Sequence, residues 1–204
     1  MSTKSLLVSM MTFMCVSVYA DKSFTFGGGF FPSQDIKISG SDGKYTYSYK
    51  PLFGFNVGWN YSHNVLSTLG ELTFTNAKFD HWTGQGSATA TFNPADYKEE
   101  NLTDISLAYY VGGTINRMGR LQIPLYAGVG CSLLAGDPFT TVDFFIGVKA
   151  RLKYFVSDNV GIFAGVDLRR GKKLKDFKDD DLSARRFTPN IEFGVVFVPK
   201  QKSK

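Results

Sequence analysis

The chain has 204 residues, of which 43% are hydrophobic and 20% charged, and its formal net charge is +5. This size fits one ordinary domain, and the abundance of Gly, Phe and Tyr favours pleated strands and tight turns. The positive charge is small and forms no single stripe, so we expect no nucleic-acid partner. After residue 20 no run reaches about 18 apolar residues, which argues against a transmembrane helix there.

The first 20 residues have the pattern of a cleaved secretory signal peptide. Lys4 supplies a positive charge, a mostly apolar run extends from Leu6 to Val18, and a small-x-small cleavage site ends at Ala20. About 13 apolar residues are too few to cross a bilayer as a helix. The alternative is an N-terminal anchor helix. After cleavage Cys131 is the one cysteine left, so no intrachain disulfide is possible.

Alternation of apolar residues with period 2 predicts eight strands. The clearest keeps apolar residues at every even position from Val142 to Val156. Such a strand, tilted near 45°, would rise roughly 35 Å, which matches a bilayer crossing. In chain order the predicted strands cover residues 24–30, 45–61, 66–74, 105–115, 121–133, 142–156, 160–168 and 187–197.

The connections between these strands alternate between short and long. Short turns are expected at residues 62–65, 117–120 and 157–159, and longer loops at 32–44, 78–103, 134–141 and 171–185. An up-and-down barrel with both termini in the periplasm has this order, with tight periplasmic turns and longer outside loops. We therefore predict an all-β fold, a closed up-and-down antiparallel eight-stranded transmembrane β-barrel.

Residue size and charge predict which face of each strand points outward. The polar face is rich in Gly, Ser, Thr and Asn, which suit a narrow lumen, whereas the apolar face carries large side chains, as a lipid-facing wall does. Aromatic residues near the ends of the segments fit an interfacial girdle. The alternative is a soluble barrel with its apolar face inside. The predicted girdle consists of Tyr45, Tyr47, Trp59, Tyr61, Tyr109 and Tyr154.

The polar face also carries charges of both signs. Buried charges must be paired or hydrated, so we predict a salt-bridge network that plugs the lumen, with a narrow ion pathway as the alternative. The residues of this predicted network are Lys50, Glu71, Asp143, Lys149, Arg151, Lys153, Asp167, Arg169, Arg186 and Glu192.

Together with the leader and the loop order, strands such as Tyr126-Ala127-Gly128-Val129-Gly130 resemble the small Gram-negative outer-membrane β-barrel proteins of the opacity-protein and OmpA-transmembrane type. The resemblance implies a last strand that the barrel assembly machinery reads through Gly194 and Phe197, although Pro199 and a basic tail follow it. It further implies a protein of the cell outer membrane, in contact with lipid and lipopolysaccharide. Structural or adhesive roles through four outside loops, with an unknown extracellular ligand, are also implied. The expected parts are the signal peptide (1–20), the barrel (21–199) and the tail (200–204).

Catalytic residues are sparse in the sequence. Its two histidines are His63, in a predicted turn, and His81, which lies beside Asp80 in the same predicted loop as Ser87. A Ser/His/acid set there would fit a lipid A-modifying enzyme, but a solvated loop histidine is the simpler interpretation. No metal or cofactor motif is present, and the lysines among the aspartates of residues 172–181 favour a solvated loop over a cation site. We predict a non-enzymatic barrel without cofactor, the alternatives being the lipid A enzyme and a soluble periplasmic barrel for a hydrophobic ligand.

Overall fold

A computed structural model describes residues 21–32, 34–40, 43–63, 65–86, 101–115, 120–136, 141–173 and 183–199. The predicted signal peptide and the basic tail lie outside these residues. No helix among them is long and apolar enough to cross a membrane. The strands are β1 (Asp21–Phe31), β2 (Gln34–Gly40), β3 (Gly43–Tyr49), β4 (Leu52–His63), β5 (Leu66–Ala77), β6 (Phe79–Gly86), β7 (Leu102–Ile115), β8 (Leu121–Ala135), β9 (Thr141–Phe155), β10 (Val160–Lys173) and β11 (Ser183–Phe197).

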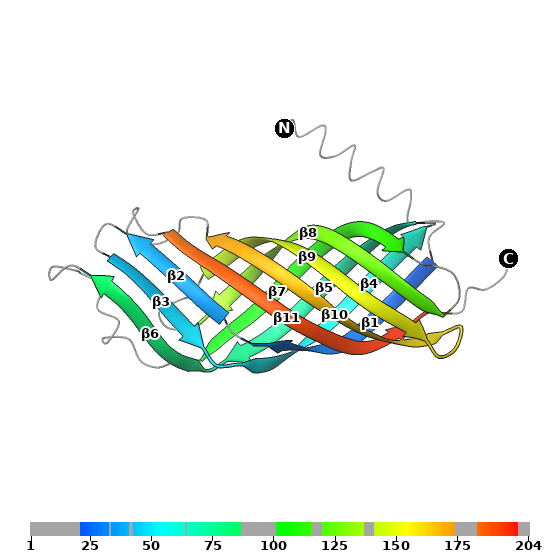
Figure 1. Cartoon of the computed structure of the whole chain (residues 1–204), viewed down its shortest axis with the longest axis horizontal. Coiled ribbons are helices and arrows are strands. Elements are labelled where there is room, and N and C mark those ends of the chain that lie inside the picture. Colours follow the sequence, from blue (N-terminus) through cyan, green and yellow to red (C-terminus); the bar gives the residue numbers. More distant parts are fainter. Residues whose placement is uncertain are drawn as a thin grey trace, which may run out of the picture.

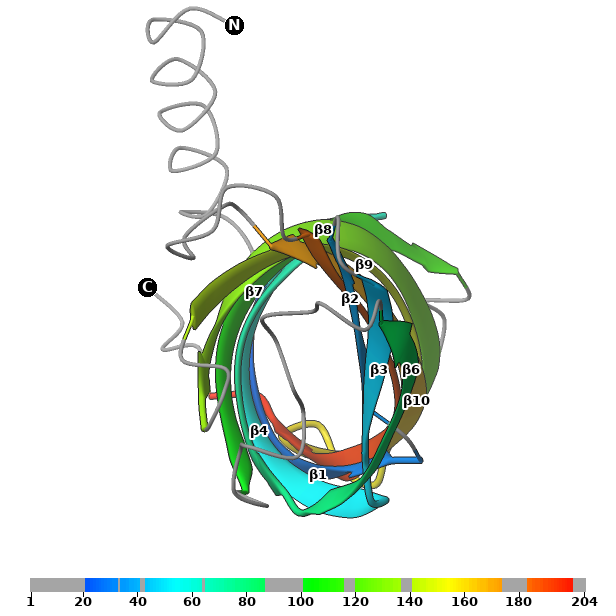
Figure 2. The same ribbon diagram turned by 90° about the vertical axis from the view of Figure 1, so that its left-hand side faces the viewer.

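Eight of these strands form a closed antiparallel barrel. Neighbours pair in the order β1-β4-β5-β7-β8-β9-β10-β11, and pairing of β1 with β11 closes the ring, which Figure 2 shows end-on. The closing register runs from Phe24 opposite Phe197 to Phe30 opposite Ile191. The predicted eight-stranded up-and-down barrel is confirmed.

Strands β2, β3 and β6 prolong one side of the barrel beyond its other strands, and we call them the extension (Figure 1). β2 pairs with β11 and with β3, and β3 pairs with β6. The β2–β3 hairpin continues the pairing of β1 with β4 into the extension. The two pairings are separated at Pro32 and Pro51, which lack the N–H that a ladder needs. The predicted loop at residues 32–44 was therefore wrong over β2, and the predicted loop at residues 78–103 was wrong over β6, while residues 87–100 lie outside the described part of the chain.

The two ends of the barrel differ. At one end, which we call the turn end, β1 begins, β11 ends, and β4–β5, β7–β8 and β9–β10 are joined. The extension projects from the opposite end, which we call the extension end; Figure 1 shows the turn end on the right and the extension on the left.

The outer face of the barrel wall is apolar. Exposure alternates strictly along β9, and the exposed fractions of Phe53, Phe55 and Ile146 are 70%, 71% and 63%. Trp59 lies over Gly70 on the neighbouring strand, where an added Cβ would meet the indole ring. A continuous wall of large exposed apolar side chains suits contact with lipid and contradicts a soluble barrel that has its apolar face inside.

The face of the chain that points inward changes at the junction between β3 and β4. Lys50 and Pro51 are both exposed, so Tyr47 and Tyr49 point inward at odd positions, whereas Leu52 and the following inward residues of β4 stand at even positions. A one-residue shift of this kind moves every preceding side chain to the opposite face. The prediction of Tyr47 as an outer girdle residue was wrong for this reason: it is buried, with 2% of its surface exposed.

Candidate functional site in the barrel lumen

The middle of the lumen holds six buried charged side chains, which we call the central cluster. Its acids are Glu71 on β5, Asp167 on β10 and Glu192 on β11, and its bases are Lys149 and Arg151 on β9 and Arg169 on β10. Three negative and three positive charges balance. All six point inward because they stand at the inward positions of their strands.

Every member of the central cluster is paired. The Nζ of Lys149 lies 3.0 Å from Glu192 and 3.2 Å from Asp167, and also contacts Glu71. Arg151 donates to both Glu71 and Glu192, and Arg169 donates to Asp167 at 2.8 Å and to Glu71 at 3.0 Å. These bonds tie β5, β9, β10 and β11 together across the barrel. A neutral, mutually bonded cluster meets the condition under which charges are tolerated in a low-dielectric interior.

Hydroxyl groups and aromatic rings surround the central cluster. Tyr110 on β7 donates to Asp167 at 3.1 Å, and Arg169 donates to Ser106 at 2.8 Å and to Thr73 at 3.2 Å. The rings of Tyr110, Phe163 and Phe145 lie 4.6 to 5.1 Å from the cationic groups of Lys149, Arg151 and Arg169, respectively. Side chains therefore fill the middle of the barrel, as expected for eight strands.

The three carboxylates of the central cluster could in principle hold a metal ion, because their oxygens lie within 4.8 Å of one another. Lys149 contacts all three of them. Its ammonium therefore occupies the place that a cation would take, and Arg151 and Arg169 balance the remaining charge. The donor set fits an internal ion network better than a metal site.

A second charged group lies nearer the extension end. Arg186 pairs with Asp104 at 2.5 Å and with Asp143 at 3.2 Å, and it donates to Ser132 at 2.8 Å. Still closer to that end, apolar side chains pack inside the wall, with Phe79 partly buried against them. This apolar cluster consists of Phe31, Ile36, Tyr47, Tyr49, Leu52, Ala77, Leu102 and Leu134. The lumen therefore changes from charged to apolar toward the extension end.

The side of the lumen formed by β1, β4 and β11 is polar but has few internal bonds. Thr25, Asn56, Thr188 and Asn190 are buried, and their side-chain polar atoms form no hydrogen bond within the described part of the chain. Gly29 makes room for one of these amides, because an added Cβ would meet the Oδ1 of Asn190. This side has the donors and acceptors to hold water, whereas the central cluster satisfies itself.

At the turn end the lumen opens into a cavity of about 460 Å³, which we call the vestibule. Asn60 lies on its wall and is held by Ser67 at 3.0 Å and by Tyr126 at 2.8 Å. The cavity is lined by Lys22, Ser23, Asn60, Ser62, Arg120, Gln122, Lys153, Phe155, Ser157, Asp158 and Val198. Its lining is basic, with Lys22, Arg120 and Lys153 against Asp158.

Nine of the ten charged residues predicted for the lumen are buried inside the barrel, and Lys50 is the exception. Its side chain is 58% exposed and lies 3.9 Å from Asp80 at the junction with the extension, so its placement in the lumen was wrong. The cause is the same change of inward face at Lys50 and Pro51. Asp104, which pairs with Arg186, was missed because the predicted strand began one residue later, although it shares the inward face of Ser106.

The other predicted residues are placed as follows. Trp59, Tyr61 and Tyr154 stand toward the turn end of their strands and Tyr109 in the middle of β7; whether they form an interfacial girdle stays a prediction. Gly194 and Phe197 lie in β11, and their recognition during assembly also stays a prediction. Asp80 contacts the exposed His81 at 2.9 Å, whereas Ser87 and the aspartates of residues 176–181 lie outside the described residues.

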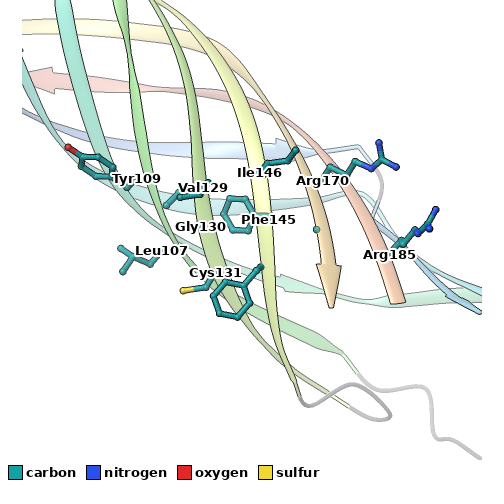
Figure 3. A pocket seen from close by; sticks show the side chains of 12 residues that line it. Leu107, Tyr109, Val129, Gly130, Cys131, Phe145, Ile146, Arg170 and Arg185 are labelled. Atoms are coloured by element: carbon teal, nitrogen blue, oxygen red, sulfur yellow. The ribbon is translucent and has the colours of Figure 1, made fainter. Parts of the chain in front are cut away.

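A shallow groove of about 740 Å³ lies on the outer wall across β7 to β11 (Figure 3). Leu107 and Tyr109 flank it on one side, Arg170 and Arg185 on the other, and Cys131 lies between them. Cys131 is a free, half-buried thiol of the apolar face. Both arginines are exposed, and neither forms an ion pair with another described residue.

Comparison with known structures bears on the whole barrel. The outer membrane protein OprG from Pseudomonas aeruginosa aligns with a TM-score of 0.64 at 7% identity, over 89% of this chain and 97% of OprG. Neisserial surface protein A aligns at 0.50 and 16% identity, over 86% and 97%. The fold is that of the small outer-membrane β-barrels. The resemblance predicted from the sequence is thereby confirmed.

The outer membrane protease OmpT from Escherichia coli also aligns, with a TM-score of 0.56 at 8% identity over 88% of this chain and 97% of OmpT. At these identities the likeness concerns the fold alone. No protein-family model matches the sequence, and no curated protein matches it.

Proposed function

We propose that the protein is a non-enzymatic barrel of the outer membrane that has a structural or surface-interaction role. The observation that carries this proposal is the contrast between the outer wall and the lumen. The wall presents large apolar side chains in every direction, and the lumen is filled by the paired central cluster. A lipid-facing wall around a filled lumen suits an anchor better than a pore.

The proposed orientation places the turn end, with both termini, in the periplasm, and the extension outside the cell. Short connections on the periplasmic side and longer elements outside are usual in outer-membrane barrels. The extension offers exposed charged side chains such as Lys37, Lys44 and Asp80 for contacts with an extracellular ligand. This assignment is the basis for an adhesive role, whose ligand is unknown.

Cell fractionation together with a heat-modifiability gel tests the membrane assignment. We expect the protein in the outer-membrane fraction, with a faster-migrating unheated band that shifts on boiling. Protein in the soluble fraction without a heat-dependent shift would overturn the proposal. In planar bilayers we expect no stepwise conductance, because the central cluster fills the lumen.

Replacing residues 34–49 by a two-residue turn tests the role of the extension. The barrel pairing of β1 with β4 stays intact in this variant, so the heat-dependent shift should persist. If the extension binds a host ligand, cells that display the variant lose adhesion to an epithelial monolayer relative to wild type. Equal adhesion at equal surface amount would exclude the β2–β3 hairpin of the extension as the adhesive part.

We propose that lipopolysaccharide contacts the outer groove. Arg170 and Arg185 stand at its rim near the extension end, where the headgroups of the outer leaflet would lie, and arginine pairs well with lipid phosphates. The apolar wall beside them suits acyl chains. Lipid A that co-purifies with wild type should be depleted in an Arg170→Ser/Arg185→Ser variant, with Lys44→Ser as the matched control.

A second candidate function is enzymatic modification of lipid A. The Nδ1 of His81 lies 2.9 Å from Asp80 at the extension end, an arrangement that can orient an imidazole as a general base. His81→Ala would then abolish a change in lipid A mass that the wild-type protein causes. Unchanged lipid A mass with both proteins would favour the non-enzymatic role.

A further inference from the structure

Lys153 lies in the lumen without an acidic partner. Only 4% of its surface is exposed, and it forms no ion pair or hydrogen bond with another described residue. Two carboxylates of the central cluster, Glu71 and Glu192, already bind Lys149 and Arg151. An unpaired buried ammonium is costly, so the site favours water, an added anion or the neutral amine, and a bound anion would hold the amine in its charged form.

The surroundings of Lys153 favour an anion. It lines the vestibule together with the exposed Lys22 and Arg120, and Asp158 is the one acidic residue of the lining among the described residues. Arg151 precedes Lys153 by two positions on the inward face of β9. Its Nη1 atom is also buried and has no hydrogen-bond partner among the described residues. Ser23 and Gln122 add neutral donors, whereas the Ser62 hydroxyl already donates to Asn60. Three cations against one acid give the cavity a positive potential.

The vestibule lies between the turn end of the barrel and the central cluster. It opens at the turn end, and the central cluster fills the lumen beyond Arg151. Its volume of about 460 Å³ accepts a small ligand with some water, but not a folded partner. A ligand that enters here would bind and leave through the same mouth.

We propose that the vestibule binds a small oxyanion, namely phosphate or a phosphate monoester, which pairs with the Lys153 ammonium. A phosphate has several strong acceptor oxygens and can bond a lysine, an arginine and hydroxyl donors together. The phosphate supplies the negative charge that Lys153 lacks. Lys22 and Arg120 already line the cavity, so they can contact the phosphate without moving into the interior.

The test uses the full mature chain, refolded in detergent micelles and titrated with inorganic phosphate. Sodium chloride at equal ionic strength is the reference. We expect a saturable rise of the thermal unfolding midpoint with phosphate and saturable heat in calorimetry. Lys153→Gln should weaken phosphate binding by about tenfold or more, because a charge-assisted bond is lost. Lys44→Gln, which removes an exposed lysine of the extension, should bind phosphate as wild type does.

Three results would overturn the proposal. One is a phosphate effect no larger than that of chloride; another is unchanged phosphate affinity in Lys153→Gln. The third is equal saturation by acetate, which would assign the vestibule to carboxylates. If Lys153→Gln does not refold, an Arg120→Gln/Lys22→Gln variant keeps the buried lysine and removes only exposed charges. It should still bind phosphate, more weakly than wild type, and full wild-type affinity would contradict the role of the basic lining.

Discussion

Lys149 and Lys153 stand four residues apart on the same inward face of β9, in two differently built regions of one lumen. Lys149 lies in the central cluster and contacts three carboxylates, whereas Lys153 lines the vestibule and contacts none among the described residues. Both side chains are almost completely buried. Burial alone therefore does not decide what a charge contributes; the partners do.

The comparison extends to the residues around each lysine. The central cluster is neutral, and its hydrogen bonds reach from β5 to β11. The vestibule carries an excess of positive charge and faces the solvent at the turn end. A fully hydrogen-bonded network stabilises one arrangement of its side chains, so we assign rigidity to the central cluster. The vestibule has polar groups without partners among the described residues, so we assign ligand binding to it.

The largest expected effect is that of Lys149→Met. It leaves three carboxylates against two arginines in a buried site, so the free energy of unfolding should fall by about 3–5 kcal/mol. Urea unfolding in detergent micelles, followed by the heat-dependent gel shift, measures this loss. The matched control Lys149→Met/Glu192→Gln restores neutrality and should recover part of the stability. A loss below about 1 kcal/mol for the single variant would show that the central cluster is not held by charge balance.

The sequence alone predicted the eight barrel strands and the barrel closure, though not β2 and β6 of the extension, because period-2 alternation persists wherever one face meets the lumen and the other meets lipid. It failed where that alternation changes its phase. Lys50 and Pro51 are both exposed, and this single shift misplaced both Lys50 and Tyr47. No local feature of the sequence reveals that the inward face changes at Lys50 and Pro51.

The charged residues of the lumen could be gathered from the sequence, but their pairing could not. Glu71 and Arg151 are 80 residues apart in the chain, and Glu71 and Arg169 are 98 apart. Their contacts depend on the stagger of every strand between them around the ring. For the same reason the sequence did not distinguish Lys149, which has acidic partners, from Lys153, which has none in the described part of the chain.

A smaller effect is expected from removing single hydroxyls on the two sides of the lumen. Tyr110→Phe removes the hydroxyl that donates to Asp167 in the central cluster. The free energy of unfolding should fall by about 1–3 kcal/mol. Thr25→Val, on the β1 side, removes a hydroxyl without a hydrogen bond among the described residues, so its cost should stay within about 0.5 kcal/mol. Urea unfolding in micelles compares the two. Equal losses would mean that the β1 side is as tightly bonded as the central cluster.

The last expected effect is small and of opposite sign, and it is that of Lys153→Met. Methionine is similar in length, and the change removes a buried charge without breaking an ion pair. In phosphate-free buffer the free energy of unfolding should therefore stay level or rise by up to about 1 kcal/mol. Phosphate should stabilise wild type more than the variant, so adding phosphate shifts the difference in their free energies of unfolding in favour of wild type. If Lys153→Met instead loses stability as Lys149→Met does, then the Lys153 ammonium has a partner within the protein, and the distinction between the two regions of the lumen fails.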